Sequence, residues 1–343
     1  MSDTLRAAVL RTPGPIGQDR LGFETRALPE PSDGEILVRV SACGVCRTDL
    51  HIVEGELAPH HPAIVPGHQV VGRIAKRGRG VSLSEGTRVG ISWLGGTDGT
   101  CTFCRAGREN LCDAPTFTGY DVDGGYATYA LARADFAHTL PGELDDLRAA
   151  PLLCAGIIGF RALRVAGVQP GERVGLFGFG ASAHLALPVL RAWGCYVAIA
   201  TRGEKHRAFA RRLGADWIGD ALERPPEALH RAITFAPAGD VVVAALGSLR
   251  KGGVVAINAI HLDRMPQFDY DSLLWGEREI RSVANMTRDD ARDFLALAVE
   301  IDLQPETTIF PFERVNDALR AVKDDAIDGA AVVQIDASVE RSG

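Results

Sequence analysis

Residues 173–183 read Arg-Val-Gly-Leu-Phe-Gly-Phe-Gly-Ala-Ser-Ala, an apolar run that ends in the pattern Gly178-x-Gly180-x-x-Ala183. Where such a pattern follows a strand and opens a helix, the first glycine permits a tight turn. The second glycine lets backbone N–H groups approach a pyrophosphate, and the small third residue allows close contact between helix and strand. The stretch therefore predicts a dinucleotide site at a strand–helix turn.

The residues around this turn continue the alternation of strand and helix. We expect strands at 173–177, 196–200, 232–235 and 254–257, and helices at 181–193, 204–213 and 240–249. Alternation of this kind is typical of a parallel, doubly wound α/β sheet. Before about Pro141 the pattern is different, because short β-like runs (37–40, 70–74, 88–91 and 126–131) are broken by glycine and proline. That half predicts a small β-rich domain. The tail predicts helices at 291–300 and 314–323 and a strand at 331–335.

The bulk properties describe an ordinary globular protein. The chain has 343 residues, which suits two domains, with 46% hydrophobic and 24% charged residues. A formal net charge of −7 argues against nucleic acid or an anionic membrane as partner. No apolar leader or membrane-spanning run is evident, so we expect a cytoplasmic protein. In that compartment the seven cysteines favour metal binding over disulfides.

Three residues form a candidate metal site: Cys46, His68 and Cys154. Two thiolates and one imidazole suit tetrahedral Zn²⁺ and leave its fourth position open. The spacing alone also allows coincidence, since a lone buried cysteine or histidine is usually a packing residue. The surrounding residues are more specific: Cys46 opens the run Cys-Arg-Thr-Asp-Leu-His, and His68 lies in Pro-Gly-His-Gln.

Together these motifs resemble the zinc-dependent medium-chain alcohol dehydrogenase family, and the resemblance covers nearly the whole chain. It implies a GroES-like, β-rich catalytic domain at residues 1–154, with a structural zinc lobe at about 95–115. It also implies a Rossmann dinucleotide-binding domain at 155–288 and a C-terminal segment at 289–343 that returns to the catalytic domain. The implied reaction is reversible hydride transfer between a primary or small secondary alcohol and NAD(P)⁺, in a homodimer or homotetramer.

The resemblance also implies site roles. The catalytic zinc ligands would be Cys46, His68 and Cys154. Asp49 would orient the ligand histidine. Thr48 would accept the alcohol proton and His51 would pass it to solvent, which fits the need of a buried site for a path to a group that titrates near neutral pH. Arg47 matches a position that can contact the pyrophosphate.

Two positions depart from the family pattern. Gln69 follows the ligand histidine where the family usually has glutamate, so we expect altered ligand exchange at the metal. Asp98 stands where the first of four lobe cysteines is usual, ahead of Cys101, Cys104 and Cys112. A carboxylate is an acceptable zinc ligand, though it should bind less tightly than a thiolate. The alternative is a degraded lobe with residual cysteines.

The end of the second central strand bears on the choice of cofactor. An NAD enzyme places an acid there for the ribose 2′-hydroxyl, whereas this chain has Thr201, Arg202 and, one helical turn on, Lys205. Arg202 offers a planar donor fork for a 2′-phosphate and Lys205 a second positive charge. This favours NADP(H) over NAD(H). The alternative is a solvated Arg202 and no discrimination.

Three large apolar residues are candidates for the substrate pocket: Leu57, Trp93 and Phe117. Trp93 matches a family position in the substrate cleft, where a bulky indole would favour primary alcohols and aldehydes. For all three the alternative is core packing. A polyol or sugar dehydrogenase is a second function to weigh, although such enzymes usually carry a carboxylate in place of Cys154. A third is a non-catalytic cofactor-binding relative, which would have no need of the whole set Thr48, Asp49 and His51.

Overall fold

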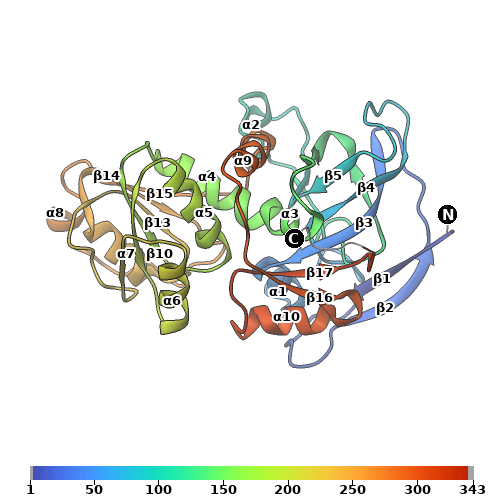
Figure 1. Cartoon of the computed structure of the whole chain (residues 1–343). Helices are drawn as coiled ribbons and strands as arrows, with labels where there is room; N and C mark the ends of the chain where they lie inside the picture. Colours follow the sequence, from blue (N-terminus) through green and yellow to red (C-terminus); the bar gives the residue numbers. More distant parts are fainter. Residues whose placement is uncertain (1–2, 339–343) are drawn as a thin grey trace. The chain divides into compact units, whose positions relative to one another are not determined.

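Alternating strands and helices form one of the two units into which the chain divides in the computed structural model, which describes residues 3–338 (Figure 1). This central unit comprises Ala155–Met286 and Glu300–Leu303. The N-terminal unit comprises the residues up to Cys154, Thr287–Val299 and the residues from Gln304 onward. The chain therefore enters the central unit after Cys154 and first returns at Thr287.

The central unit holds a six-stranded sheet whose neighbouring strands are all parallel. In spatial order the strands are β12 (Trp217–Gly219), β11 (Tyr196–Ala200), β10 (Arg173–Phe177), β13 (Leu229–Thr234), β14 (Leu249–Ile257) and β15 (Glu279–Ser282). The helices of this unit are α4 (Ile157–Ala166), α5 (Ala181–Ala192), α6 (Glu204–Arg212), α7 (Gly239–Gly247) and α8 (Tyr270–Leu273). The predicted doubly wound sheet is confirmed.

The strand order reverses at β10. The chain moves outward from β10 to β11 and β12, then returns to place β13 on the other side of β10. Ligands of open parallel sheets bind at the carboxyl ends of the strands at such a reversal. Gly178 follows β10 directly, so the glycine motif lies at this point of the sheet.

The N-terminal unit is built around one larger sheet that is mostly antiparallel. Its spatial order is β16 (Thr307–Pro311), β17 (Ala330–Gln334), β3 (Glu35–Val45), β4 (Gln69–Arg77), β5 (Arg88–Ile91) and β9 (Ala137–Thr139), and β8 (Tyr129–Arg133) also pairs with β3. Two further pairs are β1 (Thr4–Leu10) with β2 (Leu21–Ala27) and β6 (Leu94–Gly96) with β7 (Thr116–Phe117). The helices are α1 (Arg47–Glu54), α2 (Thr102–Arg105), α3 (Asp146–Pro151), α9 (Arg288–Glu300) and α10 (Val315–Lys323). Strands from the tail thus complete the sheet that β3 and β4 begin.

One predicted strand begins later than expected. The run 126–131 was predicted to be extended throughout, but β8 begins only at Tyr129. The residues before it bond elsewhere, since the backbone N–H groups of Gly125 and Tyr126 donate to Gly67 O and Pro66 O at 2.7 and 3.0 Å. Residues 125–126 therefore support the segment that carries His68 and do not join β3.

The helical stretch Asp146–Ala166 contradicts the expectation that no apolar run is long enough to span a membrane. By length and composition it would suffice, with a mean hydropathy of 1.5. However, 72% of the most apolar 18-residue window of this stretch is buried inside the protein, as in the core helices of globular proteins.

A buried histidine on α5 should make the fold sensitive to acid. His184 is 2% exposed, and neither ring nitrogen has a hydrogen-bond partner among the described residues. Burial lowers the pKa of His184 to about 4, against only a small opposing effect of the Ala181 and Gly180 backbone. The unfolded chain binds this proton near pH 6.5, so stability should fall as the pH drops from about 6.5 to about 4.

Replacing this residue should remove that sensitivity. We expect His184→Leu to reduce the loss of unfolding free energy between pH 7.5 and 5 by about 2 kcal/mol, as measured by urea denaturation. The exposed His261 provides the control, because His261→Leu should leave the pH dependence unchanged. An unaltered slope in His184→Leu would contradict the assignment.

Candidate active site and metal centres

The junction of β3 and α1 positions Cys46. Its thiol caps α1, because Sγ accepts the backbone N–H of Thr48 at 3.4 Å. In return the Asp49 carboxylate (Oδ2) accepts the backbone N–H of Cys46 at 2.8 Å. This reciprocal capping box holds the start of the helix. The Cys46 thiol and the Asp49 carboxylate both lie beside the ring of His68.

Sheet pairing brings His68 beside Cys46. Gly44, near the end of β3, pairs with Gln69 at the start of β4, so the residues that flank the two strands meet. Gly67 permits the approach, since its φ is 96° and a Cβ there would lie 2.7 Å from the Tyr126 ring. The sequence Gly67-His68 is therefore a structural requirement of this turn.

Hydrogen bonding fixes the orientation of the His68 ring. Its Nδ1 lies 3.1 Å from Asp49 Oδ1, and its Nε2 lies 3.3 Å from Cys46 Sγ. When Nδ1–H donates to the carboxylate and a metal ion takes the place of a proton on Nε2, that nitrogen offers its lone pair to the metal. Both side chains are almost fully buried.

Cys154 lies beside Cys46 and His68 and belongs to a π-helical turn. The turn spans Leu152–Gly156 and follows α3, which ends at Pro151. Wider turns of this kind are frequent at functional sites. The ligand atoms of Cys46, His68 and Cys154 all lie within 4.8 Å of one another. A tetrahedral zinc would place sulfur and nitrogen ligands about 3.6 Å apart, so the geometry of the three residues fits the ion.

The charges in this cluster are buried and interdependent. Burial raises the pKa of Asp49, and the His68 charge opposes that rise. For His68, burial acts to lower the pKa, but the charges of Asp49 and Cys46 outweigh it and raise the pKa well above its usual range. The contact with the Cys154 thiol and the His68 charge, working against burial, lower the pKa of Cys46. Such a set of buried anionic groups is one that a divalent cation stabilises.

Gln69 lies beside this cluster without adding charge to it. The residue is 2% exposed, and its Nε2 has no hydrogen-bond partner among the described residues. Its side chain lies against Gly44, where a Cβ would be 2.8 Å from Gln69 Cδ. The amide therefore fills the space next to the metal ligands and leaves it neutral.

The predicted proton path follows α1 toward solvent. Thr48 is buried, and His51 lies one turn further along the same face with its side chain 24% exposed. Nδ1 of His51 contacts a carboxylate oxygen of Glu56, which is 57% exposed. The sequence interpretation missed Glu56, because Gly55 at the helix C-cap has φ 82° and turns the chain back toward His51.

Aromatic rings adjoin the metal ligands. The Trp93 ring meets the His68 ring edge-on at 5.1 Å and stacks on Phe117 at 4.7 Å. Tyr120, which the sequence interpretation did not single out, continues the stack at 6.1 Å from Trp93. Leu57 packs against the core of the N-terminal unit. Trp93 packs against the same core but also contacts the candidate metal ligand His68, whereas no such contact is found for Leu57 among the described residues.

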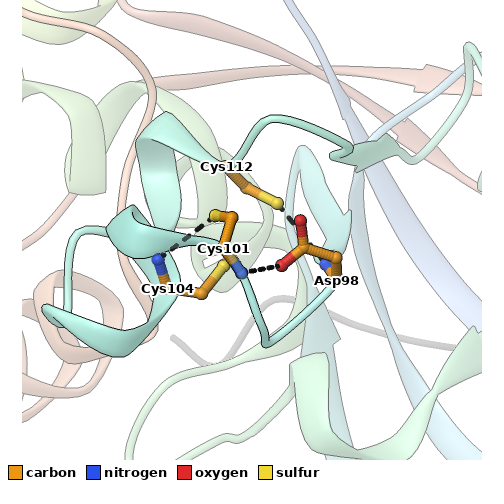
Figure 2. Close-up of side chains that lie close together, drawn as sticks. All are labelled: Asp98, Cys101, Cys104 and Cys112. Atoms are coloured by element: carbon orange, nitrogen blue, oxygen red, sulfur yellow. Dashed lines mark hydrogen bonds between the residues drawn. The ribbon is translucent and has the colours of Figure 1, made fainter.

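A second cluster occupies the lobe between β6 and β7. The ligand atoms of Asp98, Cys101, Cys104 and Cys112 lie within 4.8 Å of one another and converge in Figure 2. Asp98 Oδ1 accepts the backbone N–H groups of Thr100 and Cys101 at 2.7 and 2.9 Å. These N–H groups, that of Cys101 first, hold the pKa of Asp98 well below its usual range. One carboxylate oxygen is thus anchored while the other faces the thiols.

Backbone N–H groups also donate to the sulfur atoms of the lobe cysteines. Cys101 Sγ accepts the Cys104 N–H, and Cys112 Sγ accepts the N–H groups of Asp98 and Ala114, each at 3.4 Å. Helix α2 contains no buried residue, so the lobe lacks an apolar core at this point. A closed set of one carboxylate and three thiolates fits zinc, and such small folds draw their stability from the ion.

The dinucleotide motif takes the predicted conformation. Gly178 has φ 91°, and a Cβ there would lie 2.9 Å from Ala236 N. A Cβ on Gly180 would meet nothing within 4 Å, so the space at the start of α5 is open. No side chain caps α5, which leaves its first N–H groups available to a phosphate. Ala183 is fully buried, as its packing role requires.

The turn after β11 presents one unpaired cation. Thr201 is buried, and its N–H bonds to Gly219 O at 3.1 Å. Arg202 is exposed, and within residues 3–338 its side chain forms neither a hydrogen bond nor an ion pair. The nearby Glu204 is neutralised by Arg207 and Arg211. The remaining predicted cofactor residues, Arg47 and Lys205, are exposed as well.

Comparison with known proteins agrees with this geometry. Residues 32–142 match the alcohol dehydrogenase GroES-like domain. The chain is 45% identical to the probable alcohol dehydrogenase AdhA of Mycobacterium tuberculosis over 97% of its own length and 98% of that protein. It is 36% identical to an alcohol dehydrogenase of Geobacillus stearothermophilus, over 90% and 94% of the two chains. The cobalt- and zinc-bound alcohol dehydrogenase from Pyrobaculum aerophilum has the same fold, with a TM-score of 0.86, 22% identity and coverage of 97% and 100%. The chain belongs to the medium-chain alcohol dehydrogenase family.

Proposed function

We propose that this alcohol dehydrogenase is zinc-dependent and transfers hydride between a small primary alcohol and NADP⁺, or from NADPH to the matching aldehyde. The observation that carries the proposal is the convergence of Cys46, His68 and Cys154 within 4.8 Å. An intact set of two thiols and one imidazole also favours this function over a polyol dehydrogenase or a non-catalytic relative. Zinc bound there supplies a Lewis acid that makes an alcohol hydroxyl more acidic.

The chain's own residues then handle the proton. Asp49 keeps the proton of His68 on Nδ1, so the ring offers Nε2 to the metal. The Thr48 hydroxyl accepts the alcohol proton, and His51 carries a proton onward to solvent beside Glu56. A bound nicotinamide would supply the acceptor for the carbon-bound hydride, so that loss of one proton and one hydride would balance formation of the carbonyl double bond. The reverse sequence reduces an aldehyde.

The Trp93 indole limits the substrates. Its edge-on contact with His68 puts a bulky ring beside a metal ligand, and the rings of Phe117 and Tyr120 stack with the indole. A rigid aromatic wall so close to the reacting centre leaves room for a small or flat substituent on the alcohol carbon. This favours primary alcohols and aldehydes over large secondary alcohols.

The cofactor preference rests on Arg202. An exposed guanidinium at the turn after β11, without a partner in residues 3–338, is suited to a 2′-phosphate. We expect Arg202→Ala to raise KM for NADPH about ten- to a hundredfold, the range for losing hydrogen bonds to a charged group, and to leave KM for NADH nearly unchanged. Initial rates at the nicotinamide absorbance band measure both.

The matched control is Arg250→Ala, because Arg250 is also an exposed arginine of the central unit. It should change neither KM value. A wild-type enzyme that prefers NADH would overturn the cofactor assignment and leave the dehydrogenase standing. No turnover with either cofactor on short and aromatic aldehydes would favour the non-catalytic alternative.

We further propose that Asp98, Cys101, Cys104 and Cys112 hold a structural zinc.

We also propose that the enzyme is at least a dimer. The edge strand β15 is exposed and carries Glu279 and Arg281 on either side of Ile280. A second copy paired antiparallel about Ile280 would set each glutamate against an arginine. Exposed Tyr270 and Trp275 lie just before this strand. A monomer in sedimentation velocity at micromolar concentration would contradict the dimer.

A further inference from the structure

The start of α9 is tied to the metal lobe by one carboxylate. Glu109 accepts the backbone N–H of Arg288 at 2.7 Å and also the guanidinium, through Nε at 3.0 and 3.1 Å and Nη2 at 2.6 Å. The Glu109 side chain is 11% exposed. A two-pronged pair between arginine and carboxylate is among the strongest and most directional contacts that side chains make.

Arg288 is held from other sides too. Its guanidinium lies 4.4 Å from the centre of the Phe136 ring and donates to Asp135 O at 3.2 Å. Thr287 and Asp290 cap each other at the same helix start, through Thr287 N to Asp290 Oδ2 at 2.9 Å and Asp290 N to Thr287 Oγ1 at 3.1 Å. Glu109 therefore accepts a backbone N–H group of the first turn, that of Arg288, which the Thr287–Asp290 cap does not bind.

Glu109 and a predicted metal ligand share a single turn. The 3₁₀ helix Glu109–Leu111 ends at Cys112, whose N–H donates to Glu109 O at 3.0 Å. The neighbouring α2 buries no residue, so apolar packing does little to hold this part of the lobe. An ion at Asp98, Cys101, Cys104 and Cys112 (Figure 2) would fix Cys112. Through the 3₁₀ turn that ends at Cys112 it would also fix Glu109.

We propose that Glu109 is a positioning residue through which metal binding in the lobe holds the start of α9. This inference rests on the proposed lobe metal. Its consequence concerns the return of the chain, because α9 begins just after the chain re-enters the N-terminal unit at Thr287, and its last residue, Glu300, belongs to the central unit again. Loss of the lobe metal should loosen this helix start although no metal ligand lies on α9.

Hydrogen exchange measured by mass spectrometry on the intact enzyme tests the inference. We expect Glu109→Gln and Cys112→Ser each to speed exchange in the peptide 286–294 by roughly tenfold or more, the effect of losing hydrogen bonds to a charged group. The double variant should exchange no faster than the faster single variant, because both changes release the same contact. Arg288→Lys, which keeps the charge but loses the fork, should give a smaller rise.

Asp289→Asn is the matched control. It removes an acid from the same helix turn, but Asp289 pairs with Arg292 and not with the lobe, so exchange at residues 286–288 should stay at the wild-type rate. Metal analysis accompanies each variant. If Cys112→Ser leaves the zinc content unchanged, the lobe metal itself and this inference both fail. If zinc is lost while α9 exchanges at the wild-type rate, the lobe metal stands and the inference fails.

Discussion

Cys154→Ala should lower kcat/KM for aldehyde reduction by about 10³-fold or more and remove one zinc per chain. A Lewis acid contributes several kcal/mol to this chemistry, and each 1.4 kcal/mol is worth a factor of ten. Among the three ligands, Cys154 gives the clearest test. Cys46 also caps α1, and removing His68 would take the imidazole donor away from Oδ1 of the fully buried Asp49. Cys154 lies in a π-turn with no such second role in the described contacts.

Cofactor binding separates loss of the metal from loss of the fold. NADPH fluorescence should still report binding in Cys154→Ala, since the turn at Gly178 lies in the other unit. Cys195→Ala serves as the control, because Cys195 is a buried thiol of the central unit that belongs to neither metal-binding cluster found among the described residues. A Cys154→Ala enzyme that keeps its zinc and most of its activity would refute the assigned ligand set.

Thr48→Val should lower kcat for alcohol oxidation by about 10²- to 10³-fold, within the range for losing a positioned proton acceptor. Valine replaces the hydroxyl with a methyl group of similar size at a buried position, and the backbone N–H that binds Cys46 Sγ remains. Zinc content should therefore stay at the wild-type level.

Thr48→Ser is the matched variant, because it keeps the hydroxyl and should retain most of the activity. The comparison is made from the pH dependence of kcat for all three enzymes. If Thr48→Val turns over at the rate of Thr48→Ser, the proton leaves the alcohol by another route and the relay through Thr48 and His51 is wrong.

Local patterns were enough to predict the central sheet. The bounds of β10 and β11 agree with the expected 173–177 and 196–200, because both are largely apolar runs closed by glycine or polar turns. The same holds for β5 at 88–91. The donor sets of both metal clusters were also predictable, since the motifs around them resemble those of the family, and the fold brings each set within 4.8 Å.

Contacts between distant parts of the chain set the features that the sequence interpretation missed. The Thr287–Asp290 cap starts helix α9 at Arg288 and not at 291, and Glu109, far away in the sequence, accepts the N–H group of Arg288. The strand predicted from residue 126 starts later, because Tyr126 bonds to the segment before His68. Glu56 reaches His51 only after the turn at Gly55. None of these partners is visible from periodicity or spacing.

Restoring zinc to chelator-treated enzyme tests the central claim most directly. NADPH oxidation with an aromatic aldehyde is followed while zinc is added back in fractions of one equivalent per chain. The arrangement of Cys46, His68 and Cys154 predicts almost no turnover without metal and recovery in proportion to the zinc added. Recovery should be complete when each chain has bound one zinc in addition to the one held by the lobe. Full turnover in the metal-free enzyme would contradict it.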